Sequence, residues 1–176
     1  MTKKIVLFAL FVLPLSIFAQ DLKFGHIDRA EIIKVMPEYA AAQKTLEDDG
    51  LKYKERISEL QSEFQTKLAN YQQNSATLTD AIKTSKEKEL QDLQTRFQEF
   101  YQKAQDDLQA KEVDLMKAIS DKLNKAIQEV GNENGFMYIF DVQGKSQEQV
   151  GPTGVLYYSS KSIDVLPLVK KKLNIK

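Results

Sequence analysis

The chain has 176 residues, the length of one domain, and its 25 basic and 25 acidic side chains leave no net positive charge for binding nucleic acid. It contains no cysteine, which excludes disulfides, thiolate metal sites and a lipid-modified amino-terminal cysteine. A single histidine is too few for a histidine-based metal site or triad.

Residues 1–19 have the organisation of a secretory signal peptide. Two lysines near the start precede an almost wholly apolar run, 5–18, and Ala19 offers a small residue for cleavage before Gln20. The run is too short for a typical membrane-spanning helix. We therefore expect export and cleavage, with an uncleaved membrane anchor as the alternative. The mature chain would carry 23 basic and 25 acidic side chains, and without disulfides it depends on packing or assembly for its stability.

Residues 22–28 alternate polar and apolar side chains, which predicts a short strand. The strand ends at a helix start signal, because Asp28 is a good N-cap residue and Glu31 completes a capping box. A short helix is therefore expected from Arg29. Pro37 disfavours helical geometry at the residue before it but suits the first turn of a new helix, so a second helix is expected to begin there.

Residues 37–130 predict two long amphipathic helices joined by a turn near 72–79. Apolar residues recur at steps of three or four in each half, so they line one face of each helix. They are Tyr53, Ile57, Leu60, Phe64, Leu68 and Tyr71, then Leu90, Leu93, Phe97, Phe100, Ala104, Leu108, Leu115, Ile119, Leu123, Ile127 and Val130. Polar residues that turn well lie between the halves, so the apolar faces meet in an antiparallel hairpin. Because this arm is only two helices thick, we expect it to be marginally stable and mobile near its tip.

The C-terminal part predicts further strands and one helix. Gly131 is expected to end the second long helix. Residues 136–142 form the best strand, and because they are apolar on both faces the strand should be central and covered. Residues 143–152 read as a loop and 153–158 as another strand, after which Asp164 is expected to cap a final helix.

These elements predict an α+β chain that is mainly helical, with the arm 37–130 projecting from a small β-containing body made of 20–36 and 131–176. A body of this size in one chain is too small to cover the apolar strand 136–142. We therefore expect the bodies of several chains to associate. The candidate assembly surface is Phe24, Phe136, Tyr138, Phe140, Val155 and Tyr157.

The sequence offers no catalytic, cofactor-binding or metal site. It lacks GxGxxG, GxxxxGK[ST], GxSxG, HExxH and EF-hand patterns. His26 lies within a predicted strand and is expected to have a structural or surface role. Aromatic residues of the arm, such as Phe64 and Tyr101, are expected to pack between the helices, with contact to a bound protein as the alternative. We therefore expect no enzymatic activity and no cofactor.

With these pieces placed, the chain resembles the Skp/OmpH family of periplasmic chaperones. The resemblance rests on the order of four segments around the hairpin: 24–28 (FGHID), 37–39 (PEY), 138–141 (YIFD) and 155–158 (VLYY). It implies a periplasmic homotrimer whose bodies join in a central β-barrel-like unit while three arms enclose a cavity. Some family members have strongly basic arms, whereas these arms mix both signs.

The resemblance implies an ATP-independent holdase that binds unfolded outer-membrane proteins in its cavity, with no nucleic-acid partner and no stable membrane insertion after the signal is removed. The alternative is a structural or adaptor protein that uses the hairpin to bind one folded partner of the cell envelope. A third class, an envelope hydrolase, lacks a plausible nucleophile and base.

Overall fold

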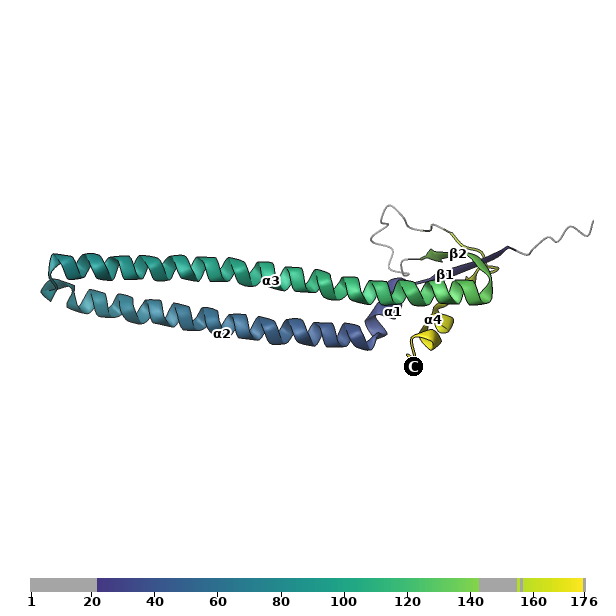
Figure 1. The fold of residues 1–176 in the computed structure, drawn as a ribbon, viewed down its shortest axis with the longest axis horizontal. Helices are drawn as coiled ribbons and strands as arrows, with labels where there is room; N and C mark the ends of the chain where they lie inside the picture. Colours follow the sequence, from purple (N-terminus) through teal and green to yellow (C-terminus); the bar gives the residue numbers. More distant parts are fainter. Residues whose placement is uncertain (1–21, 143–154, 156, 176) are drawn as a thin grey trace, which may run out of the picture.

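The computed structural model describes residues 22–142, 155 and 157–175. Along the chain these form β1 (Lys23–Ile27), α1 (Arg29–Val35), α2 (Pro37–Asn74), the short 3-10 turn η2 (Ser75–Thr77), α3 (Asp80–Asn134), β2 (Phe136–Asp141), β3 (Ile163–Asp164) and α4 (Leu166–Lys172). The predicted signal peptide and the predicted loop 143–152 lie outside the described residues. Figure 1 shows a long hairpin of α2 and α3 that projects from a small body of strands and short helices.

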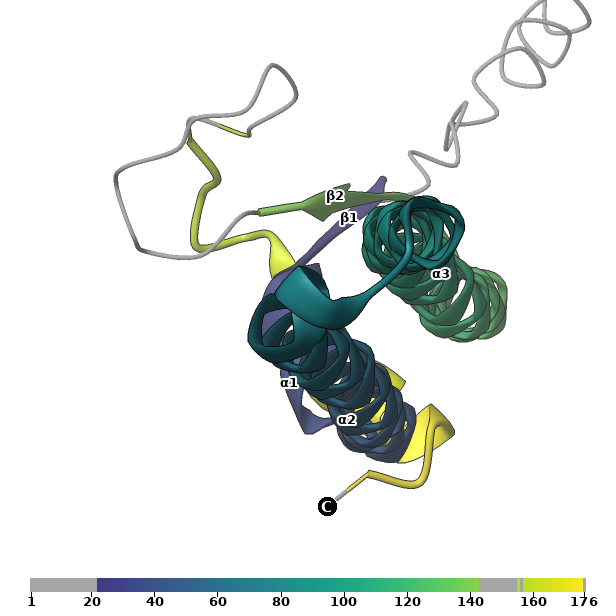
Figure 2. The ribbon, with the colours of Figure 1, turned by 90° about the vertical axis from the view of Figure 1, so that its left-hand side faces the viewer.

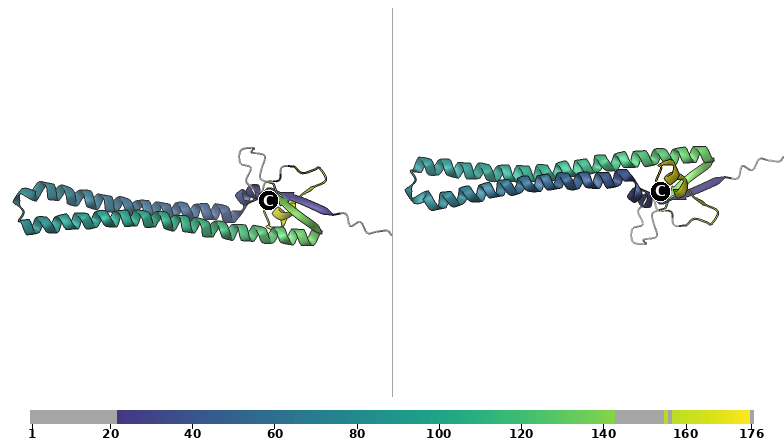
Figure 3. Two further views of the ribbon diagram at one scale, coloured as in Figure 1. Left: turned by 90° about the horizontal axis from the view of Figure 1, so that it is seen from above. Right: turned by 90° about the horizontal axis from the view of Figure 1, so that it is seen from below.

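The hairpin is the dominant feature of the fold, as the apolar periodicity predicted. α2 has 38 residues and α3 has 55, so at about 1.5 Å per residue they extend about 57 Å and 82 Å. The views from above and below in Figure 3 agree that the two helices run side by side to a shared tip. Pro37 is the first residue of α2, and Met36 before it is extended, which confirms the predicted break between α1 and α2.

The end of α3 differs from the prediction. We expected Gly131 to terminate the helix, but α3 continues to Asn134 and ends at Gly135, which adopts a left-handed conformation with φ 66°. A helix tolerates one internal glycine at a cost of about 1 kcal/mol, and the sequence Asn134-Gly135 supplies the stronger left-handed stop.

Within the described residues, the sheet has three parallel strands in the order β2-β1-β3. The expectation that 136–142 would form the central strand was therefore wrong for a single chain, because β1 is central and β2 is an edge. The predicted strand 153–158 is not observed either: its residues 153, 154 and 156 lie outside the described part, and Val155, Tyr157 and Tyr158 are not in a strand. Ile163–Asp164 is the third strand instead.

A single hydrophobic core holds the body together under one face of the sheet. It is built from Ile27, Ile32, Met36, Ala42, Ile119, Leu123, Ala126, Val130, Val165 and Val169, so every helix of the body contributes. Figure 2, seen from the tip, shows the sheet lying across the helices at the far end of the arm. Gly25 permits close packing here, because a Cβ atom at this position would lie 2.8 Å from Val165 Cγ1 and 3.1 Å from the Phe136 ring. A larger residue would push the sheet away from the core.

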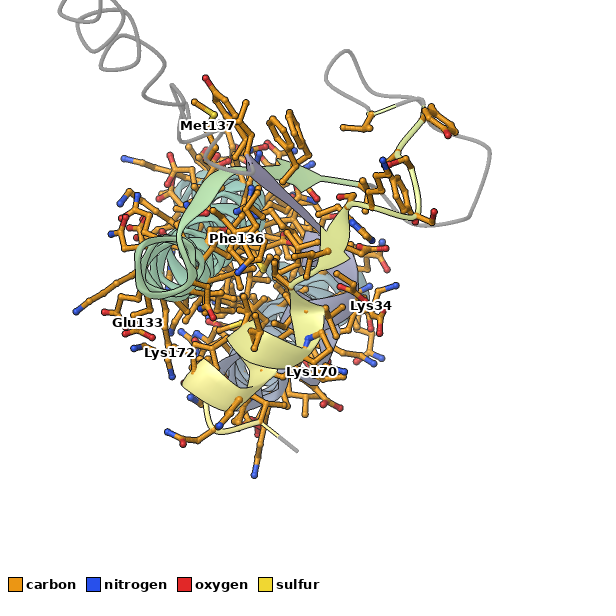
Figure 4. The ribbon with its side chains drawn as sticks, turned by 90° about the vertical axis from the view of Figure 1, so that its right-hand side faces the viewer. Lys34, Glu133, Phe136, Met137, Lys170 and Lys172 are labelled. Carbon is orange, nitrogen blue, oxygen red and sulfur yellow. The ribbon has the colours of Figure 1, made fainter. Side chains whose placement is uncertain are left out.

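The final helix begins one residue later than predicted, because Val165 and not Asp164 is its N-cap residue. Asp164 precedes the cap, and its Oδ1 still accepts a hydrogen bond of 2.9 Å from the backbone N–H of Leu166, the first residue of α4. At the other end, Lys172 Nζ lies 2.5 Å from a carboxylate oxygen of Glu133, and Figure 4 shows these two side chains next to each other. The same Nζ lies 3.1 Å from a carboxylate oxygen of Glu129. These pairs fix α4 against α3.

Candidate functional site

The outer face of the sheet, away from the core, carries exposed aromatic side chains. Phe24 on β1 stacks on Tyr138 and Phe140 of β2, with ring centroids 6.2 and 6.5 Å apart, and these two rings lie 5.9 Å from each other. Their exposed fractions are 38%, 58% and 43%. We name Phe24, Tyr138 and Phe140 the aromatic face. Contiguous exposed apolar patches of this kind are typical of interaction surfaces, whereas apolar residues that are exposed singly are common on any protein.

A groove of about 790 Å³ runs along the aromatic face and beneath the segment that precedes β3. His26 forms part of its floor: the imidazole stacks on Tyr158 at 4.1 Å and its Nδ1 lies 2.9 Å from Ser162 Oγ. Both contacts join β1 to the segment before β3, so the structure gives His26 the structural role that was predicted. Tyr157, at the groove, is 81% exposed.

Phe136 does not belong to the aromatic face, although regular alternation along the strand placed it there. In the β1–β2 register, Lys23 pairs with Phe136 and Phe24 pairs with Tyr138, so Met137 is an extra residue in β2. Figure 4 shows the result: Phe136 lies on the core side of the sheet and Met137 on the opposite side. The structure therefore removes Phe136 from the predicted assembly surface and adds the exposed Met137.

The two helices of the arm are joined by polar pairs as well as apolar contacts. From the body outward, Glu38 pairs with Lys122, Asp49 with Lys111, Tyr53 with Asp107, Lys67 with Glu89 and Tyr71 with Glu87. We name these five pairs the cross-arm ladder. The individual residues were visible in the sequence, but their pairing depends on the exact register of the hairpin, which apolar periodicity alone leaves undetermined.

Hydrogen bonds within the ladder stabilise the ionised forms of Glu38, Asp49, Glu89 and Asp107 by lowering their pKa values. Hydrogen bonding from Lys122 lowers the pKa of Glu38, and hydrogen bonds from Lys103 and then Tyr53 lower the pKa of Asp107. The hydrogen bond to Asp107 in turn raises the pKa of Tyr53. These pairs lie at the surface, so each contributes little by itself, and their value lies in fixing the register of the two helices.

The apolar stripes predicted from the sequence do face one another, but they bury little. Beyond the body core, Leu60, Leu93 and Ala104 are the buried side chains of the arm within the described residues. Tyr53 and Phe100 meet at 5.9 Å and are half-buried, while Tyr101 points outward and is 47% exposed. Most arm aromatics therefore pack between the helices, as expected, and Tyr101 is free to contact another molecule.

Neither surface has the donor set of a metal or catalytic centre. Within residues 22–142, 155 and 157–175, no group of three or more histidine and acidic side chains is arranged to hold a metal ion. In the same residues, no helix is both long enough and apolar enough to cross a bilayer. The features available for function are the aromatic face and the surface of the arm.

Comparisons with known proteins agree with this architecture. Residues 23–173 match the family described as outer membrane protein (OmpH-like). Two relatives named "Chaperone protein Skp", from Photorhabdus laumondii subsp. laumondii and Photorhabdus luminescens, are 28% and 26% identical to this chain over 122 residues, which is 68% of this chain and 72% of each relative. The match to the family covers both the arm and the body, and the chain belongs to the OmpH-like family.

Proposed function

We propose that the protein is a periplasmic holdase chaperone that binds unfolded outer-membrane proteins and prevents their aggregation without ATP. Its membership of the OmpH-like family and the name of its two relatives support a chaperone of this class. The observation that carries the proposal is the arm itself, which extends some 50 Å or more from the body and is bound to nothing in the single chain. A long projecting arm of this kind suits a protein that surrounds another protein.

Assembly into a homotrimer is the second part of the proposal. Residues 1–19 are removed on export, 20–36 and 131–176 form the assembling body, and 37–130 form the arm. Two features of the single chain support association of the bodies: β2 is an edge strand of the sheet formed by the described residues, and the aromatic face is exposed. Three arms held by one body would enclose a cavity.

The chemistry of the arm suits weak contacts with many sequences. Its surface mixes lysines, carboxylates and amides with isolated apolar side chains, among them Leu51, Ile82, Tyr101 and Val113. No single contact is strong, so a bound chain can move within the cavity and leave it without an energy source. Affinity then comes from many simultaneous contacts at high local concentration.

Aggregation of a urea-diluted outer-membrane barrel protein, followed by light scattering without nucleotide, tests the proposal. The chain from Gln20 should suppress scattering and saturate near one oligomer per client. A version with a shortened arm, in which 50–110 are replaced by a short linker so that the body core is kept, serves as the control and should not suppress it. If aggregation is unchanged at large excess of the intact chain, the holdase is refuted, and a search for one folded envelope partner would follow.

A further inference from the structure

The junction between α3 and β2 consists of one residue. α3 ends at Asn134, β2 begins at Phe136, and Gly135 between them is exposed and left-handed, with φ 66°. Figure 1 shows the chain turning back here from the end of α3 into the sheet. Asn134-Gly135 is also the one place in the sequence where glycine follows asparagine. The junction therefore combines a tight turn with a chemically labile dipeptide.

An asparagine that precedes a glycine can lose its side-chain amide without an enzyme. The backbone nitrogen of the glycine attacks Cγ of the asparagine, so an N–Cγ bond forms and the Cγ–Nδ2 bond breaks. The proton of the glycine nitrogen leaves with Nδ2 as ammonia. The cyclic imide then takes up one water and opens to aspartate or, at its other carbonyl, to isoaspartate. Glycine favours the attack because it has no side chain beside its nitrogen.

In the folded chain, hydrogen bonds hold both reacting groups away from each other. Asn134 Nδ2 donates to the carbonyl oxygen of Val130 at 2.8 Å, so the side chain is directed back along α3. The backbone N–H of Gly135 donates to the carbonyl oxygen of Asn132 at 3.4 Å, as part of the helix end. Ring closure requires both bonds to break and the helical backbone at Asn134 to rotate. The observed geometry therefore opposes the reaction.

Contacts with β1 keep this junction closed. Lys23 Nζ donates to the backbone carbonyl oxygen of Asn134 at 3.0 Å and lies 5.1 Å from the centre of the Phe136 ring. The same ring packs over Gly25, where an added Cβ atom would lie 3.1 Å from it. Rotation at Asn134 thus requires the start of β2 to separate from β1. Such local opening is a minor state of a folded protein.

We propose that Asn134 is a site of spontaneous deamidation whose reactivity is controlled by the fold. While the α3–β2 junction is closed on β1, the nitrogen of Gly135 does not reach Cγ of Asn134, and the side chain persists as the amide. In a chain whose junction is open, before folding or after the body has unfolded, the reaction converts Asn134 to aspartate and isoaspartate. The residue thus distinguishes chains that have stayed folded from chains that have not.

The products fit the folded junction less well than asparagine. Either acid lacks the Nδ2 donor, so the bond to Val130 is lost, and it places a negative charge beside Glu133 at the carboxyl end of α3, where the helix dipole disfavours it. Isoaspartate also adds a methylene group to the backbone directly before β2, which disturbs the register in which Lys23 pairs with Phe136. A chain modified while open should therefore refold into a less stable body.

Peptide mapping by mass spectrometry tests the proposal. The chain from Gln20 is kept at neutral pH, either folded or in concentrated guanidinium chloride, and the tryptic peptide 126–145 is followed over time, with electron-transfer fragmentation to identify the modified residue. Asn134 should deamidate at least about tenfold faster in denaturant than in the folded protein. Asn132 lies in the same peptide but precedes glutamate, so it is an internal control and should react slowly in both states.

Two results would overturn the proposal. One is an equal rate at Asn134 in folded and denatured protein, and the other is conversion of Asn132 as fast as that of Asn134 in denaturant. Gly135→Ala, measured in denaturant where its effect on folding does not matter, should slow the reaction at Asn134, because the added methyl group hinders the attacking nitrogen. An unchanged rate in this variant would contradict the chemistry.

A matched pair of variants tests control by the junction. Lys23→Met removes the hydrogen bond to the carbonyl of Asn134 and should speed deamidation in the folded protein without changing the rate in denaturant. Lys34→Met makes the same exchange at an exposed position on α1 and should have no effect. Equal rates in the two folded variants would contradict this role of the junction. None of these measurements depends on chaperone activity, so they can succeed or fail independently of the holdase function.

Discussion

Replacing Phe140 with aspartate should dissociate the oligomer while leaving each chain folded. Phe140 lies on the outer side of β2, stacks on Phe24 and Tyr138, and takes no part in the body core. The proposed trimer would cover this side chain with a neighbouring body. Phe140→Asp therefore places a carboxylate in the proposed interface without removing a side chain of the body core.

The structure sets the size of the effect. A phenylalanine side chain presents on the order of 200 Å², and Phe140 is 43% exposed in the single chain. Covering the exposed part would contribute about 2 kcal/mol at about 25 cal/mol per Å². An unpaired carboxylate in a covered site costs about 2–3 kcal/mol more even when water reaches it in part. Each interface should weaken by about 4–5 kcal/mol, more than a thousandfold.

Light scattering coupled to size exclusion measures this directly. The unmodified chain from Gln20 should elute with the mass of three copies, and Phe140→Asp with the mass of one at micromolar concentration, with unchanged helical content. Tyr101→Asp is the matched control, because Tyr101 is an aromatic residue with a similar exposed fraction, 47%, on the arm. An unchanged mass for Phe140→Asp, or dissociation by Tyr101→Asp as well, would refute the assignment of the interface to the aromatic face.

Three further predictions concern stability and can be checked by thermal unfolding followed by circular dichroism. Gly25→Ala should destabilise the body by about 1–3 kcal/mol, because its Cβ would lie 2.8 Å from Val165 Cγ1; an unchanged midpoint would show that the core yields easily. Gly50→Ala should instead stabilise the arm by up to about 1 kcal/mol, since nothing lies within 4 Å of the added atom, and a loss of stability would mean that α2 must bend there. Acid should loosen the arm: the pKa values of Glu89 and Asp107 are lowered in the folded state, so their contribution is complete above the ordinary carboxyl pKa near 4 and is lost as the pH falls below it. A midpoint that stays constant between pH 5 and pH 2.5 would contradict this role of the cross-arm ladder.

The hairpin and the start of its first helix were predictable because the sequence signals for them are local and repeated. The apolar spacing extends over many turns, Pro37 sets the start of α2, and the polar residues Asn74, Ser75, Thr77 and Thr79 favour a turn at the tip. The cap at Asp28 is of the same kind: its Oδ1 accepts from the backbone N–H of Glu31 at 3.1 Å, as the sequence predicted. Each of these features depends on residues within a few positions of each other.

The errors arose where distant segments compete. Gly131 has the local signature of a helix end, but it lies within α3, where Ile139 of β2 packs close to it. Gly135 ends the helix instead, because it adopts the left-handed conformation. Periodicity in β2 fails at Met137, because the bulge lets Phe136 fill the space above Gly25. The third strand is only two residues long, and the packing of the adjacent Val165 in the body core positions it beside β1. No local sequence pattern predicts such a strand.

The central claim is that one oligomer holds one unfolded client between its arms. Native mass spectrometry of the chain from Gln20, mixed with a urea-diluted outer-membrane barrel protein, measures this most directly. We predict one dominant complex of three copies with a single client, which is absent when the arm is shortened by replacing 50–110 with a linker. Complexes of one copy with a client, or clients bound equally by the protein with the shortened arm, would contradict the account.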